Sequence, residues 1–285
     1  MRIICSPIIS LMLVICFLAT AGCTGTFSPA CQPQQGPAVK YTAVSFNATP
    51  VRYAPVNGVT LGYREFGSGE PVLMVQGFGA TMDNWNETFV SILASKYHVY
   101  TYDHRGMGYS SDNNATPTIA GYADDAAGLM AALGYESMHV YGVSMGSSIS
   151  QQLAIDHPGR VRKLILDSSA YSIRLPETTK LFSEIEAAVA GPATPEGIRK
   201  EAQANLVWNG SWDGLSGIKK DVMLVVGTSD DLTPDPVSVR MAGQINGSWL
   251  VRFKGLPHVG SHYAPVEYGE NALCFLGMDE SPLTK

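Results

Sequence analysis

The sequence has 285 residues, of which 45% are hydrophobic and 15% charged, a balance typical of a globular protein and not of a disordered one. The length suits one large α/β domain and does not require a second full domain. The formal net charge is −6 and no basic stripe runs along the chain, so a nucleic-acid partner is not expected.

The first segment has the pattern of an export signal. Arg2 supplies a positive start, residues 8–18 are apolar apart from Ser10, and small residues lead to Cys23. Residues 20–23 (Thr-Ala-Gly-Cys) resemble a lipoprotein cleavage box, although a larger aliphatic residue is usual at the position of Thr20. We expect a signal peptide over residues 1–22, lipidation of Cys23 and attachment to the outer face of the cell membrane. A plain cleaved signal, which would give a secreted protein, and an uncleaved anchor are the alternatives.

A flexible tether is expected over residues 23–43, because Pro, Gln and Gly dominate residues 27–37. The folded domain is expected over residues 44–285. Outside the signal and the anchor, the cysteines are Cys31 and Cys274, and the sequence leaves open whether they pair or stay as two thiols. No C-x-x-C pair is present, and no metal site is expected.

The domain begins with a strand pair around the hairpin signal Asn57-Gly58, whose second strand covers residues 59–64. Apolar runs typical of buried parallel strands then alternate with helical patterns. The expected strands cover residues 71–76, 98–102, 138–143, 161–166, 221–226 and 249–253, and the expected helices cover residues 84–95, 118–133, 147–156, 236–245 and 265–276. This alternation predicts an α/β fold with a mostly parallel central sheet flanked by helices.

Residues 171–217 interrupt the alternation. They hold two amphipathic helical patterns, over residues 177–190 and 195–208, and no buried strand. An insertion of this kind at the carboxyl edge of a sheet is expected to act as a small helical lid.

A candidate nucleophile lies in Gly142-Val143-Ser144-Met145-Gly146, which has the pattern G-x-S-x-G. A strand leads into it and a helix leads out, and a serine on such a tight turn exposes its Oγ. The glycines allow the neighbouring backbone to pack closely. The pattern is common by chance, and a plain Gly/Ser-rich turn is the alternative interpretation.

At this point the chain resembles the α/β-hydrolase superfamily, in its serine-nucleophile, esterase- and lipase-like branch, over residues 59–276. Five segments carry the resemblance: residues 76–79 look like its His-Gly oxyanion loop, 102–110 like its Asp-x-Arg-Gly-x-Gly-x-Ser turn, 142–146 like its nucleophile elbow, 227–234 like its acid loop and 258–267 like its histidine loop. One departure is Gln76, where His is usual. We expect it to change the hydrogen bonding beneath the oxyanion loop without removing the backbone donors.

A serine hydroxyl needs an adjacent base, and an imidazole oriented by a buried carboxylate serves that purpose. Ser144, Asp230 and His258 follow the chain order serine, acid, histidine that this fold uses. Asp167, which ends a strand, and Asp231 are rival acids. His262 is the reserve base.

The backbone N–H groups of Phe78 and Met145 are the expected oxyanion donors. Their side chains are candidate pocket walls, together with Trp85, Trp208 and Trp212, for which core packing is the alternative. Among the other histidines, His104 is interpreted as structural, and the remaining three are assigned to the surface ends of strands or helices: His98, His139 and His157.

Serine at the nucleophile position favours acyl transfer. It argues against the reactions of those members of the superfamily that have an aspartate at this position. The expected function is a serine hydrolase that cleaves a carboxylic ester or related acyl bond through an acyl-enzyme intermediate, with a small-molecule acyl substrate and no cofactor. The resemblance leaves open perhydrolase or haloperoxidase, carbon–carbon bond hydrolase and aminopeptidase chemistry. A non-catalytic surface binding module is a further alternative. The membrane surface is an expected partner only through the lipid anchor at Cys23.

Overall fold

The structure is a computed structural model that describes residues 40–278. The expected signal, Cys23 with its anchor, Cys31 and most of the tether lie outside the described residues. The helices that are described are all too short or too polar to cross a lipid bilayer.

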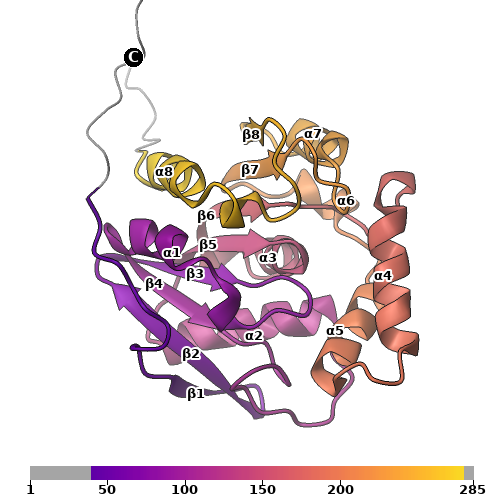
Figure 1. The fold of residues 1–285 in the computed structure, drawn as a ribbon, viewed down its shortest axis with the longest axis horizontal. Coiled ribbons are helices and arrows are strands. Elements are labelled where there is room, and N and C mark those ends of the chain that lie inside the picture. The colour runs from indigo at the N-terminus through magenta and orange to yellow at the C-terminus, as the bar shows by residue number, and fades with distance from the viewer. Residues whose placement is uncertain (1–39, 279–285) are drawn as a thin grey trace, which may run out of the picture. The chain divides into compact units, whose positions relative to one another are not determined.

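The centre of the domain is one eight-stranded sheet with the order β1-β2-β4-β3-β5-β6-β7-β8 (Figure 1). The strands are β1 (Arg52–Val56), β2 (Val59–Gly67), β3 (Glu70–Val75), β4 (Tyr97–Tyr102), β5 (Met138–Val143), β6 (Val161–Asp167), β7 (Asp221–Gly227) and β8 (Trp249–Phe253). The pairs β1–β2 and β2–β4 are antiparallel and all the others are parallel. The predicted α/β architecture is confirmed.

Helices connect these strands. They are α1 (Glu87–Ala94), α2 (Ile119–Ala132), α3 (Met145–Asp156), α4 (Thr179–Ala190), α5 (Glu196–Val207), α6 (Trp212–Leu215), α7 (Asp235–Gln244) and α8 (Pro265–Leu276). Four short 3-10 turns accompany them: η1 (Met82–Asn84), η2 (Pro158–Arg160), η3 (Pro176–Thr178) and η4 (Gly260–His262).

The sheet is buried on both faces. In β3, Leu73 packs into the cluster formed with α2, α3 and α7, whereas Val72 and Met74 pack into the cluster formed with α1 and α8. Successive side chains of a strand point to opposite faces, so a strand covered on both faces reads as a continuous apolar run. Each fully buried aliphatic side chain contributes about 1.5–3 kcal/mol to folding.

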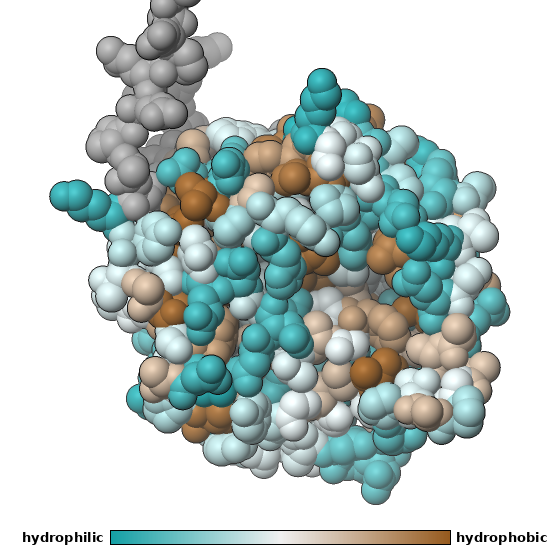
Figure 2. All heavy atoms as spheres, viewed as in Figure 1, coloured by the Kyte–Doolittle hydropathy of each residue, from teal (hydrophilic) through white to brown (hydrophobic). Residues whose placement is uncertain are grey.

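The lid segment leaves the sheet after β6 and returns at β7. β6 and β7 pair directly in parallel, so the sheet is continuous beneath the insertion. Helices α4 and α5 pack on each other around a cluster that includes Ile173, Ile185 and Ala202, and Phe78 of the main domain packs against that cluster. Figure 1 shows α4 and α5 side by side at one end of the sheet. Hydrophobic side chains gather on the face in Figure 2 where these helices meet the domain.

Candidate active site

Ser144 lies on the sharp turn between β5 and α3. Its backbone angles are φ 54° and ψ −121°, a conformation that side-chain-bearing residues rarely adopt and that costs about 1–3 kcal/mol. A Cβ on Gly146 would overlap the carbonyl oxygen of Val75, and one on Gly142 would overlap Ser150 Oγ and the Gly146 carbonyl. Both glycines are therefore required for the turn to sit this close to β3 and α3.

His258 links the serine to a carboxylate. Its Nε2 lies 2.9 Å from Ser144 Oγ, and its Nδ1 lies 2.8 Å from Asp230 Oδ2. The Asp230 side chain is fully buried, while the imidazole is 16% exposed. The structure thus brings together all three residues predicted as a triad, from loops that follow β5, β7 and β8. A proton can pass from the hydroxyl to Nε2 while the carboxylate holds the proton on Nδ1.

Asp230 is held by its own loop. Its Oδ1 accepts from the backbone N–H of Leu232 at 3.0 Å and of Thr233 at 2.8 Å. Its Oδ2 also accepts from Thr233 Oγ1 at 2.9 Å. Sequence reasoning did not single out Thr233. An aspartate followed three residues later by threonine is the pattern of a local side-chain-to-backbone turn, and that signal could have indicated it.

The two rival acids occupy other positions. Asp231 is exposed and pairs with Lys180 of α4 at 2.6 Å. Asp167 is fully buried at the end of β6, where its carboxylate accepts from Tyr141 OH at 2.8 Å and from Ser168 Oγ at 3.0 Å. Burial raises the pKa of Asp167 to about 6, against the opposing effect of these hydrogen bonds.

The loop that carries the base rests on Ser168. Ser168 Oγ accepts from the backbone N–H of Val259 at 3.0 Å, directly beside His258. Both residues have positive φ, 48° at Ser168 and 55° at Val259, and for a β-branched valine this conformation is strained. His262, the reserve base, lies on η4, where burial lowers its pKa, and it makes no hydrogen bond to Ser144 or to Asp230.

The loop after β3 passes next to the nucleophile. A Cβ on Gly77 would lie 3.1 Å from Ser144 Cβ, so a glycine permits this approach. The N–H of Gly77 donates to Gln76 Oε1 at 2.8 Å, and the N–H of Gly79 donates to Glu201 Oε2 at 2.7 Å. Between them, the N–H of Phe78 donates to no other described residue, nor does that of Met145. Both predicted oxyanion donors are therefore unpaired beside the serine. Gln76, at the position where His is usual in the family that the chain resembles, bonds within the loop.

A small cavity of about 10 Å³ borders Ser144. This is close to the minimum space for one water molecule. Its walls come from the domain core and from the lid: Phe78, Met145, Ser148, Ala170, Ile173, Leu181, Ile185, Asn205 and Thr233. The three tryptophans are absent from this lining, so their prediction as pocket walls is wrong. Trp85 packs in the core against Phe89 and Tyr141, Trp208 Nε1 donates to Gln152, and Trp212 packs on Tyr171.

One of the histidines assigned to the surface is buried. His139 is 4% exposed within β5 and its Nε2 lies 3.2 Å from Glu70, with its pKa lowered by burial. The surface assignment is wrong because β5 is a central strand covered on both faces. His98 and His157 are partly exposed and pair with Glu65 and Asp124.

The turn after β4 is structural. Asp103 is buried and accepts from the backbone N–H of Met82 at 2.6 Å and of Tyr109 at 2.7 Å. Burial is the main cause that raises its pKa. A Cβ on Gly108, where φ is 46°, would overlap the Asp103 carboxylate. These contacts fix the loop that faces the oxyanion loop and the lid.

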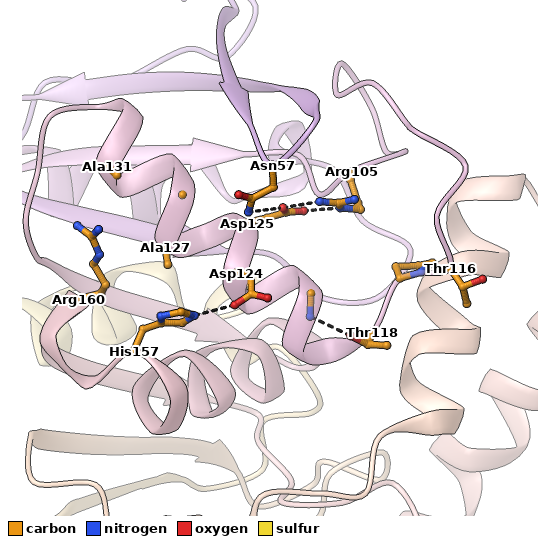
Figure 3. Close-up of a pocket in the computed structure, with 13 residues that line it drawn as sticks. Asn57, Arg105, Thr116, Thr118, Asp124, Asp125, Ala127, Ala131, His157 and Arg160 are labelled. Atoms are coloured by element: carbon orange, nitrogen blue, oxygen red, sulfur yellow. Dashed lines mark hydrogen bonds and ion pairs between the residues drawn. The ribbon is translucent and has the colours of Figure 1, made fainter.

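A larger hollow of about 420 Å³ lies over α2, and none of the triad residues lines it (Figure 3). Two ion pairs lie in its lining, Arg105 with Asp125 at 2.5 Å and His157 with Asp124 at 2.7 Å. Arg160 donates to the backbone carbonyls of Tyr135 and Glu136. Among residues 40–278, no group of three or more His, Cys, Asp or Glu side chains is placed to hold a metal ion.

Comparisons with known proteins agree with this fold. Residues 70–210 match the family model described as "alpha/beta hydrolase fold". Over 122 residues, the chain is 39% identical to the dihydrolipoyllysine-residue acetyltransferase component of the acetoin cleaving system of Cupriavidus necator, covering 42% of this chain and 32% of that protein. The chain spans only 32% to 57% of the length of the curated relatives with which it was compared.

Solved structures with the same fold are matched over more of the chain. A thermophilic esterase from Thermogutta terrifontis superimposes with a TM-score of 0.71 at 22% identity, covering 80% of this chain and 98% of that one. An esterase from Exiguobacterium antarcticum gives a TM-score of 0.71 at 20% identity, with coverages of 79% and 99%. At these identities the likeness concerns the fold. Sheet order, elbow geometry and the match of residues 70–210 to the family model agree, and the chain has the α/β-hydrolase fold.

Proposed function

We propose that this protein is a serine hydrolase that cleaves a carboxylic ester or related acyl bond through an acyl-enzyme intermediate. One observation carries the proposal: Ser144 Oγ, the His258 imidazole and the Asp230 carboxylate form one hydrogen-bonded chain, with steps of 2.9 Å and 2.8 Å. A binding module has no need to keep a serine in a strained turn against an imidazole that is bonded to a buried carboxylate.

In the first half-reaction, Ser144 Oγ attacks the carbonyl carbon and its proton passes to His258 Nε2. The carbonyl oxygen becomes an oxyanion that faces the N–H groups of Phe78 and Met145. The tetrahedral intermediate then collapses. The imidazolium returns its proton to the leaving alkoxide, which departs as the alcohol, and the acyl group stays on Ser144.

In the second half-reaction a water molecule attacks the acyl carbon and gives one proton to His258 Nε2. Collapse of the second intermediate returns that proton to Ser144 Oγ and releases the carboxylic acid. Asp230 stays ionised throughout, because its role is to hold the imidazole and to stabilise the imidazolium. Each oxyanion donor is worth about 2.7–4 kcal/mol of transition-state stabilisation in enzymes of this kind.

The cavity supports a small acyl group. Aliphatic walls from Ile173, Leu181 and Ile185 enclose the space beside Ser144, and they suit a small apolar acyl group. Export and anchoring through Cys23 remain proposals from the sequence, and they would place the reaction outside the cytoplasm.

A fluorophosphonate probe with short-chain p-nitrophenyl esters tests the proposal. The folded protein is expected to be labelled on Ser144, and Ser144→Ala is expected to lose both labelling and ester turnover while it keeps its circular dichroism spectrum. Absence of labelling in the folded wild type would refute the proposal. Labelling without turnover of any ester, thioester or lactone would favour one of the other chemistries of this superfamily.

A further inference from the structure

A carboxylate from the lid is buried against the oxyanion loop. Glu201, on α5, has 0% exposure although helix α5 lies in the lid insertion. Its Oε2 accepts from the N–H of Gly79 at 2.7 Å, and its Oε1 lies 2.9 Å from Nδ1 of His104, which is also buried. Burying a carboxylate is costly unless it is paired and hydrogen-bonded, so these two contacts are what keep Glu201 inside.

The bond to Gly79 fixes the donor next to it. The N–H of Gly79 belongs to the peptide group that also contains the carbonyl of Phe78, and a peptide group is planar. Gln76 fixes the preceding group through the N–H of Gly77. With both neighbouring N–H groups held by side-chain oxygens, the Phe78 N–H is oriented and free to meet an oxyanion.

His104 supplies the second anchor. It follows β4 in the turn whose backbone is fixed by Asp103, so its imidazole belongs to the rigid part of the domain. Its Nδ1 faces Glu201, while its Nε2 is buried without a hydrogen-bond partner among the described residues. Tyr102 and Tyr122 pack around the ring, with centroids 5.4 Å and 5.1 Å from that of His104. The catalytic scheme above uses neither residue of this pair.

We propose that Glu201 and His104 are positioning residues that orient the Phe78 donor of the oxyanion hole. Glu201 brings its acceptor oxygen from helix α5 to the Gly79 N–H, and His104 holds the glutamate in place. Without these contacts, the Gly79 N–H has no acceptor and the Phe78 donor loses its orientation. This inference rests on the proposed function, because it concerns the donor that acts in the acyl-transfer step.

The test compares kcat and KM for a short-chain ester in Glu201→Ala, Glu201→Gln and wild type. Glu201→Ala removes both contacts and is expected to lower kcat about a hundredfold with KM changed by less than about threefold, since misplacing a group near the reacting centre costs about that much. Glu201→Gln is expected to recover most of kcat. Its amide oxygen can accept from Gly79, and its amide NH₂ can donate to His104 Nδ1 in the other tautomer.

Lys200→Met is the matched control. Lys200 is the neighbour of Glu201 on α5, and its Nζ pairs with Asp112 Oδ2 at 2.5 Å, so the substitution removes another link between the lid and the same turn without touching Gly79. It is expected to leave kcat within about threefold of wild type. If Lys200→Met and Glu201→Ala lower kcat equally, loosening of the lid explains the loss and the inference is wrong.

Two further outcomes separate the proposals. If the wild type is active and Glu201→Ala has nearly the same kcat, the positioning role alone is wrong. If the wild type neither turns over esters nor reacts with a fluorophosphonate, both the proposed function and the inference are wrong. If Glu201→Ala does not fold, Glu201→Asp takes its place. It keeps the buried charge but is one methylene too short to hold Gly79 and His104 together, and kcat is expected to fall at least tenfold. An unchanged kcat in Glu201→Asp overturns the inference.

Discussion

The backbone strain at Ser144 can be measured without reference to catalysis. Its angles, φ 54° and ψ −121°, match the first central position of a type II′ turn, where glycine is the favoured residue. A pair of variants that both lack Oγ isolates the effect of the Cβ. Ser144→Ala keeps the Cβ and its strain, and Ser144→Gly removes both.

The expected difference follows from two opposing contributions. Relief of the strain is worth about 1–3 kcal/mol, while the greater freedom of glycine in the unfolded chain costs about 0.4–1 kcal/mol. Ser144→Gly should therefore be more stable than Ser144→Ala by up to about 2.6 kcal/mol, and by about 1.3 kcal/mol at the middle of both ranges. For a domain of this size, that corresponds to a rise in Tm of about 2–4 °C per kcal/mol.

The assay is urea unfolding of both variants, followed by circular dichroism. We expect a higher midpoint for Ser144→Gly with an unchanged denaturant slope, since the exposed surface does not change. Ala131→Gly on the exposed side of α2 is the control, and it should be destabilising by about 0.5–1 kcal/mol. If Ser144→Gly is no more stable than Ser144→Ala, the turn is not strained in solution and the reasoning from its angles is refuted.

Three more predictions concern the carboxylates and the cavity. Asp230→Asn should lower kcat for a short-chain ester by about 10⁴-fold, because the imidazole loses its correct tautomer, whereas Asp231→Asn, next to it and exposed, should stay within twofold. Burial holds the pKa of Asp167 at about 6, above the ordinary value of 3.8 for an aspartate. The folded chain therefore binds more protons than the unfolded chain between these two values, and stability falls as pH rises through them. Asp167→Asn should remove that fall, by up to about 3 kcal/mol at about 1.4 kcal/mol per pKa unit, and urea midpoints at pH 4 and pH 7 that keep the wild-type difference would contradict it. Ile185→Ala should enlarge the cavity and raise the hexanoate-to-acetate ratio of kcat/KM at least tenfold, and an unchanged ratio would mean that the acyl group binds elsewhere.

Sequence patterns predicted those parts of the site that are formed by residues close together in the chain. The glycines around Ser144, the strand before it and the helix after it are consecutive in the chain, and the close contacts of Gly142 and Gly146 give the physical reason for the motif. The apolar runs also predicted the parallel strands, because a strand that is buried on both faces does not need polar side chains. The catalytic roles of Ser144, Asp230 and His258 stay predictions until the labelling experiment is done.

What the sequence did not predict depends on contacts between distant segments. A glutamate in an amphipathic helix is expected at the surface, and Glu201 is buried only because its partners, Gly79 and His104, come from loops about 100 residues earlier. The prediction of the three tryptophans as pocket walls was wrong because the lining of the cavity also depends on contacts between distant segments. Amphipathic periodicity indicates that α4 has an apolar face, but it does not show that Leu181 and Ile185 line the cavity beside Ser144.

The direct pairing of β6 with β7 has a consequence for engineering. Because the sheet is continuous beneath residues 171–217, this insertion could be exchanged for one of another length without altering the register of any strand. Glu201 limits that freedom, since an exchanged segment that lacks an acceptor for the Gly79 N–H would leave the domain folded but its oxyanion loop unsupported. A successful graft for a new substrate must therefore carry a carboxylate or amide to this one point, whatever its remaining sequence.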